Sequence, residues 1–135
     1  MGMQNEVKKV SWNASQGIIM EVSNRRSYAN AFFINGDIKK AFNTLISIKQ
    51  SVVQSFSDTQ RNSLKKIEEK FNECSGFLSS SSANSFNKKN REAYSLATKL
   101  AKKIYSEYND KLMDLLNTYG YLIGEQTDAS KMKFT

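Results

Sequence analysis

The sequence predicts an all-α protein, a helical bundle of about four helices with an N-terminal helical hairpin, a third helix and a long C-terminal helix. Hydrophobic residues recur at intervals of three and four through most of the chain, which is the spacing of a helix that is buried on one face. Proline is absent, so only glycine, asparagine and serine interrupt these patterns. The length of 135 residues, 39% of them hydrophobic, fits one compact domain.

The first two helices are expected to form a tight hairpin. Apolar residues keep a helical spacing from Ala14 to Ile34, and Asn35-Gly36 follows as a C-terminal cap. Asp37 is a typical N-cap for the second helix, whose apolar face continues to Phe56. Residues 1–13 show no helical period, so we expect an extended or mobile N-terminal arm in front of a single bundle domain over residues 14–124.

A capping box at Ser57–Gln60 predicts the start of the third helix, and Cys74 falls in its apolar series. A serine-rich stretch over 79–87 predicts a flexible loop. The longest pattern then runs from Lys88 to Gly120 and predicts a helix of about 48 Å. Tyr121–Ile123 is expected to fold back onto the bundle, and residues 125–135 to form a polar tail.

Two resemblances follow from these segments. Tyr28–Leu45, with aromatic residues before a Gly-Asp turn and an Ala-Phe pair after it, resembles the turn of one tetratricopeptide hairpin. No second turn occurs one period later, so no repeat array is predicted. The layout of hairpin, polar loop and long helix over residues 18–123 resembles small uncharacterised all-helical proteins of tailed bacteriophages and viral metagenomes. This resemblance implies a viral accessory or virion-associated role and assigns no functional residue.

The composition excludes most familiar enzyme sites. Histidine is absent and Cys74 is the single cysteine, so the chain has no Ser-His-Asp triad, histidine metal site or intrachain disulfide. The helical position of Cys74 favours a small core residue over a reactive thiol. Apolar runs are shorter than the roughly 18 residues that span a bilayer, so we expect a cytoplasmic protein, in a virion or host cytoplasm, with no membrane contact.

Acidic residues are the remaining candidates for metal chemistry. Glu107, Asp110 and Asp114 share one face of the long helix and could bind a hard cation. Glu107 also precedes Lys111 by four residues, the order that favours a surface ion pair. A solvated helix surface is the better interpretation, and we predict no catalytic, cofactor or metal site.

Charge is distributed unevenly along the long helix. Six cations and one carboxylate lie between Lys88 and Lys103, whereas one lysine and five carboxylates lie between Ile104 and Asp128. This order opposes the helix dipole, which indicates an external partner, either a second copy packed antiparallel or head-to-tail, or a polyanion. The candidate nucleic-acid residues are Lys88, Lys89, Arg91, Lys99, Lys102 and Lys103, and lysine-rich contacts of this kind are insensitive to sequence. The alternative is a lysine-rich solvated surface that only aids solubility.

The long helix should extend past the shorter helices, which leaves an apolar face uncovered. A second copy of the chain would cover it, and we expect a homo-oligomer. The predicted interface consists of Leu112, Leu115, Leu116 and Tyr119. The sequence thus favours a non-enzymatic, oligomeric interaction or structural protein, a viral or mobile-element accessory, that could also contact another protein. The alternative is a sequence-nonspecific nucleic-acid-binding accessory protein.

Overall fold

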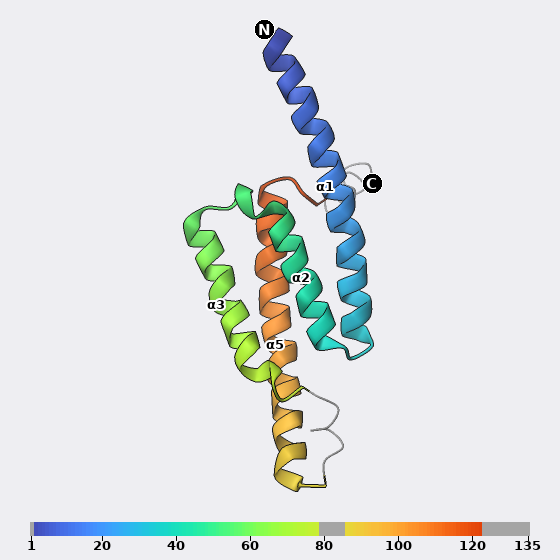
Figure 1. Cartoon of the computed structure of the whole chain (residues 1–135), viewed down its shortest axis with the longest axis vertical. Coiled ribbons are helices and arrows are strands. Elements are labelled where there is room, and N and C mark those ends of the chain that lie inside the picture. Colours follow the sequence, from blue (N-terminus) through green and yellow to red (C-terminus); the bar gives the residue numbers. More distant parts are fainter. Residues whose placement is uncertain (1, 79–85, 123–135) are drawn as a thin grey trace, which may run out of the picture.

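The computed structural model describes residues 2–78 and 86–122, with side chains described from residue 16 onward. Within these ranges the chain forms four α-helices and no strand, and a short 3-10 turn over Val53–Ser55 follows the second helix. The prediction of an all-α helical bundle is confirmed. The helices are α1 (Gly2–Ile34), α2 (Ile38–Val52), α3 (Asp58–Ser75) and α5 (Lys88–Thr118) (Figure 1).

The helices pack as two antiparallel pairs. α1 and α2 form the N-terminal hairpin, and α3 runs antiparallel to α5 (Figure 1). α5 also packs against α2, so it joins the two pairs. The N-terminal end of α5 extends below α2 and α3 in Figure 1, so the other described helices leave most of the surface of that part uncovered.

The predicted C-terminal ends of α1 and α5 and the predicted N-terminal ends of α2 and α3 are confirmed, whereas α2 ends at Val52, before the predicted Phe56. Gly36 and Gly120 take positive φ angles of 85° and 79°, which glycine adopts without strain, and they follow the ends of α1 and α5. The carboxylate of Asp37 accepts the backbone N–H three residues later, at 3.3 Å. Ser57 and Gln60 form the reciprocal capping box. Local sequence therefore sets where each of these helices begins or ends.

The N-terminal segment differs from its prediction. α1 begins at Gly2, so residues 2–13 are helical and the prediction of an extended arm is wrong. Figure 1 shows this end of α1 projecting beyond the other helices. Apolar residues recur at helical spacing only where a helix packs against a neighbour, so their absence does not exclude a helix. Methionine, glutamine, glutamate and lysine, which occur in residues 2–13, have high helix propensity. The predicted loop at 79–87, apart from its last two residues, and the tail at 125–135 lie outside the described ranges.

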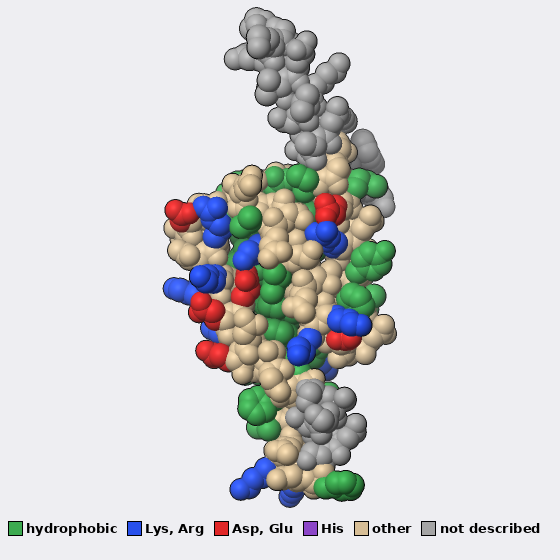
Figure 2. Space-filling model, in the orientation of Figure 1, with side chains coloured by type: hydrophobic (Ala, Val, Ile, Leu, Met, Phe, Trp, Pro, Cys, Tyr) green, Lys and Arg blue, Asp and Glu red, His purple; other side chains and the backbone are tan. Residues whose placement is uncertain are grey.

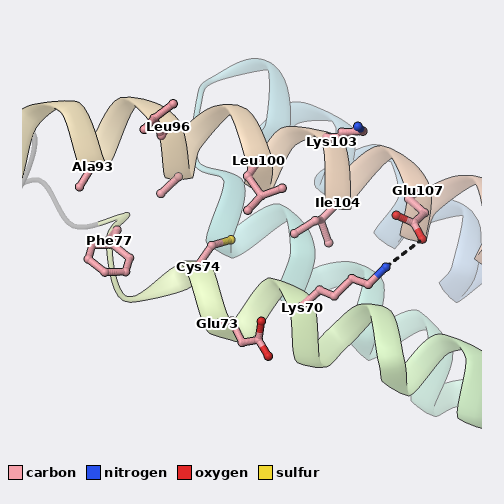
Figure 3. Close-up of a pocket in the computed structure, with 11 residues that line it drawn as sticks. Lys70, Glu73, Cys74, Phe77, Ala93, Leu96, Leu100, Lys103, Ile104 and Glu107 are labelled. Carbon is pink, nitrogen blue, oxygen red and sulfur yellow. Dashed lines mark ion pairs between the residues drawn. The ribbon is translucent and has the colours of Figure 1, made fainter.

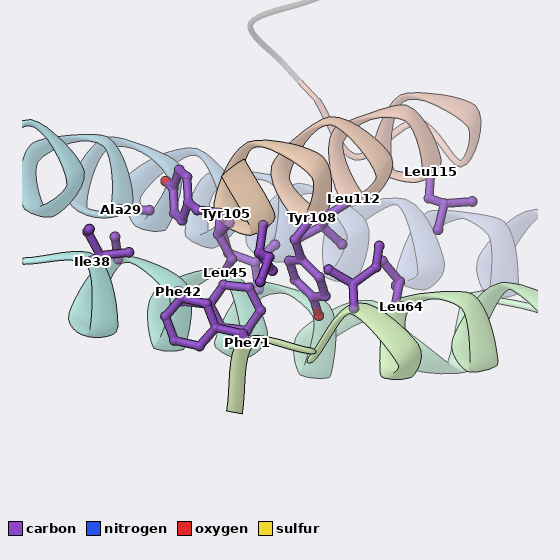
Figure 4. Close-up of a cluster of buried hydrophobic side chains, with 14 of the residues drawn as sticks. Ala29, Ile38, Phe42, Leu45, Leu64, Phe71, Tyr105, Tyr108, Leu112 and Leu115 are labelled. Carbon is purple, nitrogen blue, oxygen red and sulfur yellow. The ribbon is translucent and has the colours of Figure 1, made fainter. Parts of the chain in front are cut away.

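The core centres on aromatic residues from three helices (Figure 4). The rings of Phe42 and Phe71 stack with centroids 3.9 Å apart, and Tyr108 packs against Phe42 at 4.8 Å. Tyr108 is fully buried, and its hydroxyl donates a hydrogen bond to the Glu68 carboxylate at 2.7 Å. Lys49 binds the same oxygen at 2.6 Å. One carboxylate on α3 thus links α2 to α5.

The chain folds back after α5 as predicted, as far as it is described. Leu122 is buried in the core, and the hydroxyl of Tyr121 shares a hydrogen bond of 2.6 Å with the hydroxyl of Ser55. Ile123, the last residue of the predicted return, lies outside the described part. Among the helices that the structure describes, none combines the length and apolar character required to cross a membrane.

The hydrogen bond between Tyr108 and Glu68 provides a direct test of this core. We expect Tyr108→Phe to lower the free energy of unfolding by about 1–2 kcal/mol, because the bond joins a buried hydroxyl to a charged acceptor. Tyr119→Phe, at the C-cap of α5, is the matched control, since the Tyr119 hydroxyl donates a hydrogen bond to Gln60 on the surface at 2.8 Å. The control should change stability by less than about 0.5 kcal/mol. Equal losses in urea unfolding would contradict the assignment.

Stability should also fall at alkaline pH. Burial raises the pKa of Tyr108 far above the ordinary value of 10.0, and the Glu68 carboxylate raises it further. Burial raises the pKa of Tyr105 as well. The folded state retains these protons when the unfolded state loses them, so stability is complete below pH 10 and declines as pH rises above it. Tyr108→Phe should make this decline shallower in urea unfolding measured from pH 8 to 11; an unchanged slope would contradict the prediction.

Candidate interaction groove

A groove of about 620 Å³ lies between the C-terminal end of α3 and the N-terminal half of α5 (Figure 3). It forms where α5 continues past the end of α3. Its lining is mostly apolar, with charged side chains at the edges. We call it the α3–α5 groove; its lining residues are Lys70, Glu73, Cys74, Phe77, Ala93, Leu96, Ala97, Leu100, Lys103, Ile104 and Glu107.

The floor of the groove belongs to the core. Cys74, Ala97 and Ile104 are all buried. The thiol of Cys74 donates to the carbonyl oxygen of Phe71 at 3.3 Å, and burial raises its pKa. A raised pKa keeps the thiol protonated and therefore weakly nucleophilic. The prediction that Cys74 is a small core residue is confirmed.

The walls of the groove are apolar side chains that remain in solvent. Phe77 is 52% exposed, Leu96 68% and Leu100 50%. Figure 3 shows Leu100 on α5 above Cys74, with Phe77 at the end of α3 opposite Ala93. Large apolar residues are commonly exposed one at a time, but a cluster beside a groove is typical of a surface that binds another molecule.

Charged side chains border this apolar surface. Lys70 of α3 and Glu107 of α5 form an ion pair across the inner end of the groove at 3.9 Å, and both are exposed (Figure 3). Glu73 and Lys103 line the two edges. The groove therefore offers an apolar centre with polar groups of both signs around it, which is the usual composition of a protein-interaction surface.

The six candidate nucleic-acid residues are all exposed. At about 100° per residue, Lys88, Arg91, Lys99, Lys102 and Lys103 share the face of α5 opposite the core, whereas Lys89 lies on the groove side. We call these five residues the basic stripe. Lys88 also approaches Glu92 at 4.0 Å. Figure 2 shows basic side chains at the projecting end of α5. The structure therefore places five of the six predicted cations on one solvated face.

The predicted oligomer interface is not an exposed surface. Leu112, Leu115 and Leu116 are buried within one chain, at most 8% exposed, so their prediction as an uncovered face is wrong. Tyr119 is 39% exposed and packs on Phe56 at 5.6 Å. The helix does extend past its neighbours, but at its other end. Apolar periodicity shows that a face exists but not which end of it the shorter helices cover.

Sequence reasoning missed two of the exposed apolar residues, Phe77 and Leu96. Phe77 follows Gly76 at a helix end and belongs to no helical series. Leu96 lies about 100° around α5 from the buried Ala97, so a search for one apolar face omits it. The available signal was a second series, in which Leu96 follows Ala93 by three residues and precedes Leu100 by four.

The carboxylate series Glu107, Asp110 and Asp114 was predicted to be solvated surface. Glu107 is used in the ion pair with Lys70. Throughout the described ranges, the structure assembles no group of three acidic or cysteine side chains that could hold a metal ion. A second hollow, of about 520 Å³ between α1 and α5, is lined mostly by polar residues such as Arg26, Asn30 and Asn109.

The chain matches no model of a known protein family, and comparison with curated proteins and with solved structures found no match.

Proposed function

We propose that this chain is a non-enzymatic interaction protein that binds an amphipathic helix of another polypeptide in the α3–α5 groove. The observation that carries the proposal is the cluster of Phe77, Leu96 and Leu100, each at least half exposed beside a groove with a buried floor. Exposure of such an apolar cluster to water is unfavourable in free energy, and a ligand that covers the cluster removes this unfavourable term.

The shape of the groove favours a helix as the ligand. It runs along two antiparallel helices, so a third helix can lie against both with ordinary helix packing. Helices that bind in such grooves present apolar residues at intervals of three and four. The charged edges, Lys70 and Glu73 on α3 and Lys103 and Glu107 on α5, suit a ligand with polar flanks. The loose resemblance of the layout to small phage proteins supports a viral accessory setting for this role.

Selection from a random peptide library, with the protein immobilised sparsely so that chains do not meet, tests the proposal. We expect the enriched peptides to carry apolar residues at helical spacing and to bind with micromolar dissociation constants. Leu96→Glu with Leu100→Glu should weaken their binding at least tenfold, because both charges would enter the apolar surface. Leu115→Val, a conservative core change, is the control. Selection of no helical peptide, or equal binding by the glutamate variant, would refute the proposal.

The basic stripe supports a second candidate function, the sequence-independent binding of nucleic acid. Five exposed cations on one face of α5 can contact successive phosphates, each contact releasing counterions. Four of the five are lysines, which attract phosphate without reading bases. The stripe lies beside the groove and shares only Lys103 with it, so variants of its other members test the two functions separately.

A salt titration tests the second candidate. If the stripe binds single-stranded DNA, the logarithm of the binding constant should fall with the logarithm of salt concentration with a slope of about −3, as expected for four or five phosphate contacts. Lys99→Glu with Lys102→Glu should reduce binding at least tenfold. The control is Lys65→Glu with Lys66→Glu, the same charge change on α3. Equal losses in the two variants would leave only a general effect of net charge and would contradict a role for the stripe.

A further inference from the structure

We infer that the helix bound in the α3–α5 groove is α5 of a second copy of this chain. The two α5 helices pack antiparallel around a two-fold axis that lies between Leu96 and Leu100. The inference rests on the proposed function and identifies the ligand. It also replaces the oligomer interface predicted from the sequence, which the structure buries within one subunit.

α5 carries a second helical series beside its buried face. Its members follow one another at steps of four, three, four, three and four residues, which is the heptad spacing of a two-helix coiled coil. All but Ala93, which is half-buried, are exposed in the single chain. We call this series the outer seam; its residues are Lys89, Ala93, Leu96, Leu100, Lys103 and Glu107.

The outer seam is complementary to itself when one copy is reversed. Pairing Leu96 with the partner's Leu100 fixes the register. In an antiparallel pair a step up one helix is a step down the other, so the two residue numbers of every facing pair add up to the same value as 96 and 100. Lys89 faces the partner's Glu107 in that register, so opposite charges meet at both ends of the seam. Such pairs at the edge of an interface set orientation and register.

A second opposite pair supports the same register. Glu92, next to the seam, comes beside the partner's Lys103, and the two-fold axis repeats each pair. The dimer therefore has four attractive contacts around two central leucine pairs. Like charges also approach one another: the two Lys99 side chains meet near the axis on the solvated side, and the partner's Lys89 comes near Lys70, which is paired with Glu107.

A parallel arrangement lacks this complementarity. Each seam residue would then face its own copy, which would place lysine against lysine at 89 and 103 and glutamate against glutamate at 107. Like charges that face each other directly are destabilising. The groove also suits the antiparallel pair, because Phe77, just past the end of α3, lines the groove opposite Ala93 and can contact the partner helix (Figure 3).

Crosslinking of single cysteines in a Cys74→Ala chain tests the arrangement. With a short bismaleimide, Lys99→Cys should give a covalent dimer, because this position meets its own copy near the axis. Lys89→Cys alone should not, since its two copies are about 27 Å apart along the helix. A mixture of Lys89→Cys and Glu107→Cys chains should crosslink. Strong crosslinking of Lys89→Cys alone, or none in the mixture, would overturn the antiparallel register.

A charge exchange in the native-cysteine chain tests the same register without relying on the folding of Cys74→Ala. By sedimentation, Lys89→Glu or Glu107→Lys should each raise the dimer dissociation constant about tenfold, since two pairs become repulsive. The double variant should return to within about threefold of the parent. Lys102→Glu, with the same charge change outside the seam, is the control. No recovery in the double variant would overturn the inference.

The two proposals fail separately. A chain that stays monomeric at millimolar concentration but still selects helical peptides through Leu96 and Leu100 would overturn the dimer and leave the proposed function standing. A chain that selects no such peptide refutes the proposed function, whatever its oligomeric state.

Discussion

The length of α5 is the constraint on which the remaining features depend. It has 31 residues, against 15 in α2 and 18 in α3, its two main neighbours. Two shorter helices can cover only part of it. The covered part contains the core, and the uncovered part contains both the apolar wall of the groove and most of the basic stripe. A shorter α5 would leave neither surface.

Polar contacts fix where along α5 the shorter helices lie. Tyr108, in the middle of α5, is held between the aromatic ring of Phe42 and the carboxylate of Glu68, which Lys49 also binds. A hydrogen bond to a buried hydroxyl has a narrow range of favourable geometry, so α3 cannot slide along α5 without breaking it. This contact places the end of α3 near Ala97 and thereby determines which leucines remain exposed.

Much of the fold was predictable because it depends on local signals. Ser57, Gln60, Asp37 and the two glycines with positive φ act on backbone groups within a few residues, so the sequence predicts them directly. The error at residues 2–13 has the opposite origin. The prediction there relied on the lack of apolar residues at helical spacing, although a helix that projects from the bundle does not require an apolar face.

The sequence alone determined that the chain is helical, where α2 and α3 begin and where α1 and α5 end, and that α5 is longer than the helices that cover it. Tertiary structure decided which part of that surface is covered. Leu112 and Leu100 have similar chemistry and lie on the same helix, yet one is fully buried and the other is half exposed. The physical reason is that helical periodicity fixes the direction of a side chain around its own axis, whereas burial depends on how far the neighbouring helices slide along that axis.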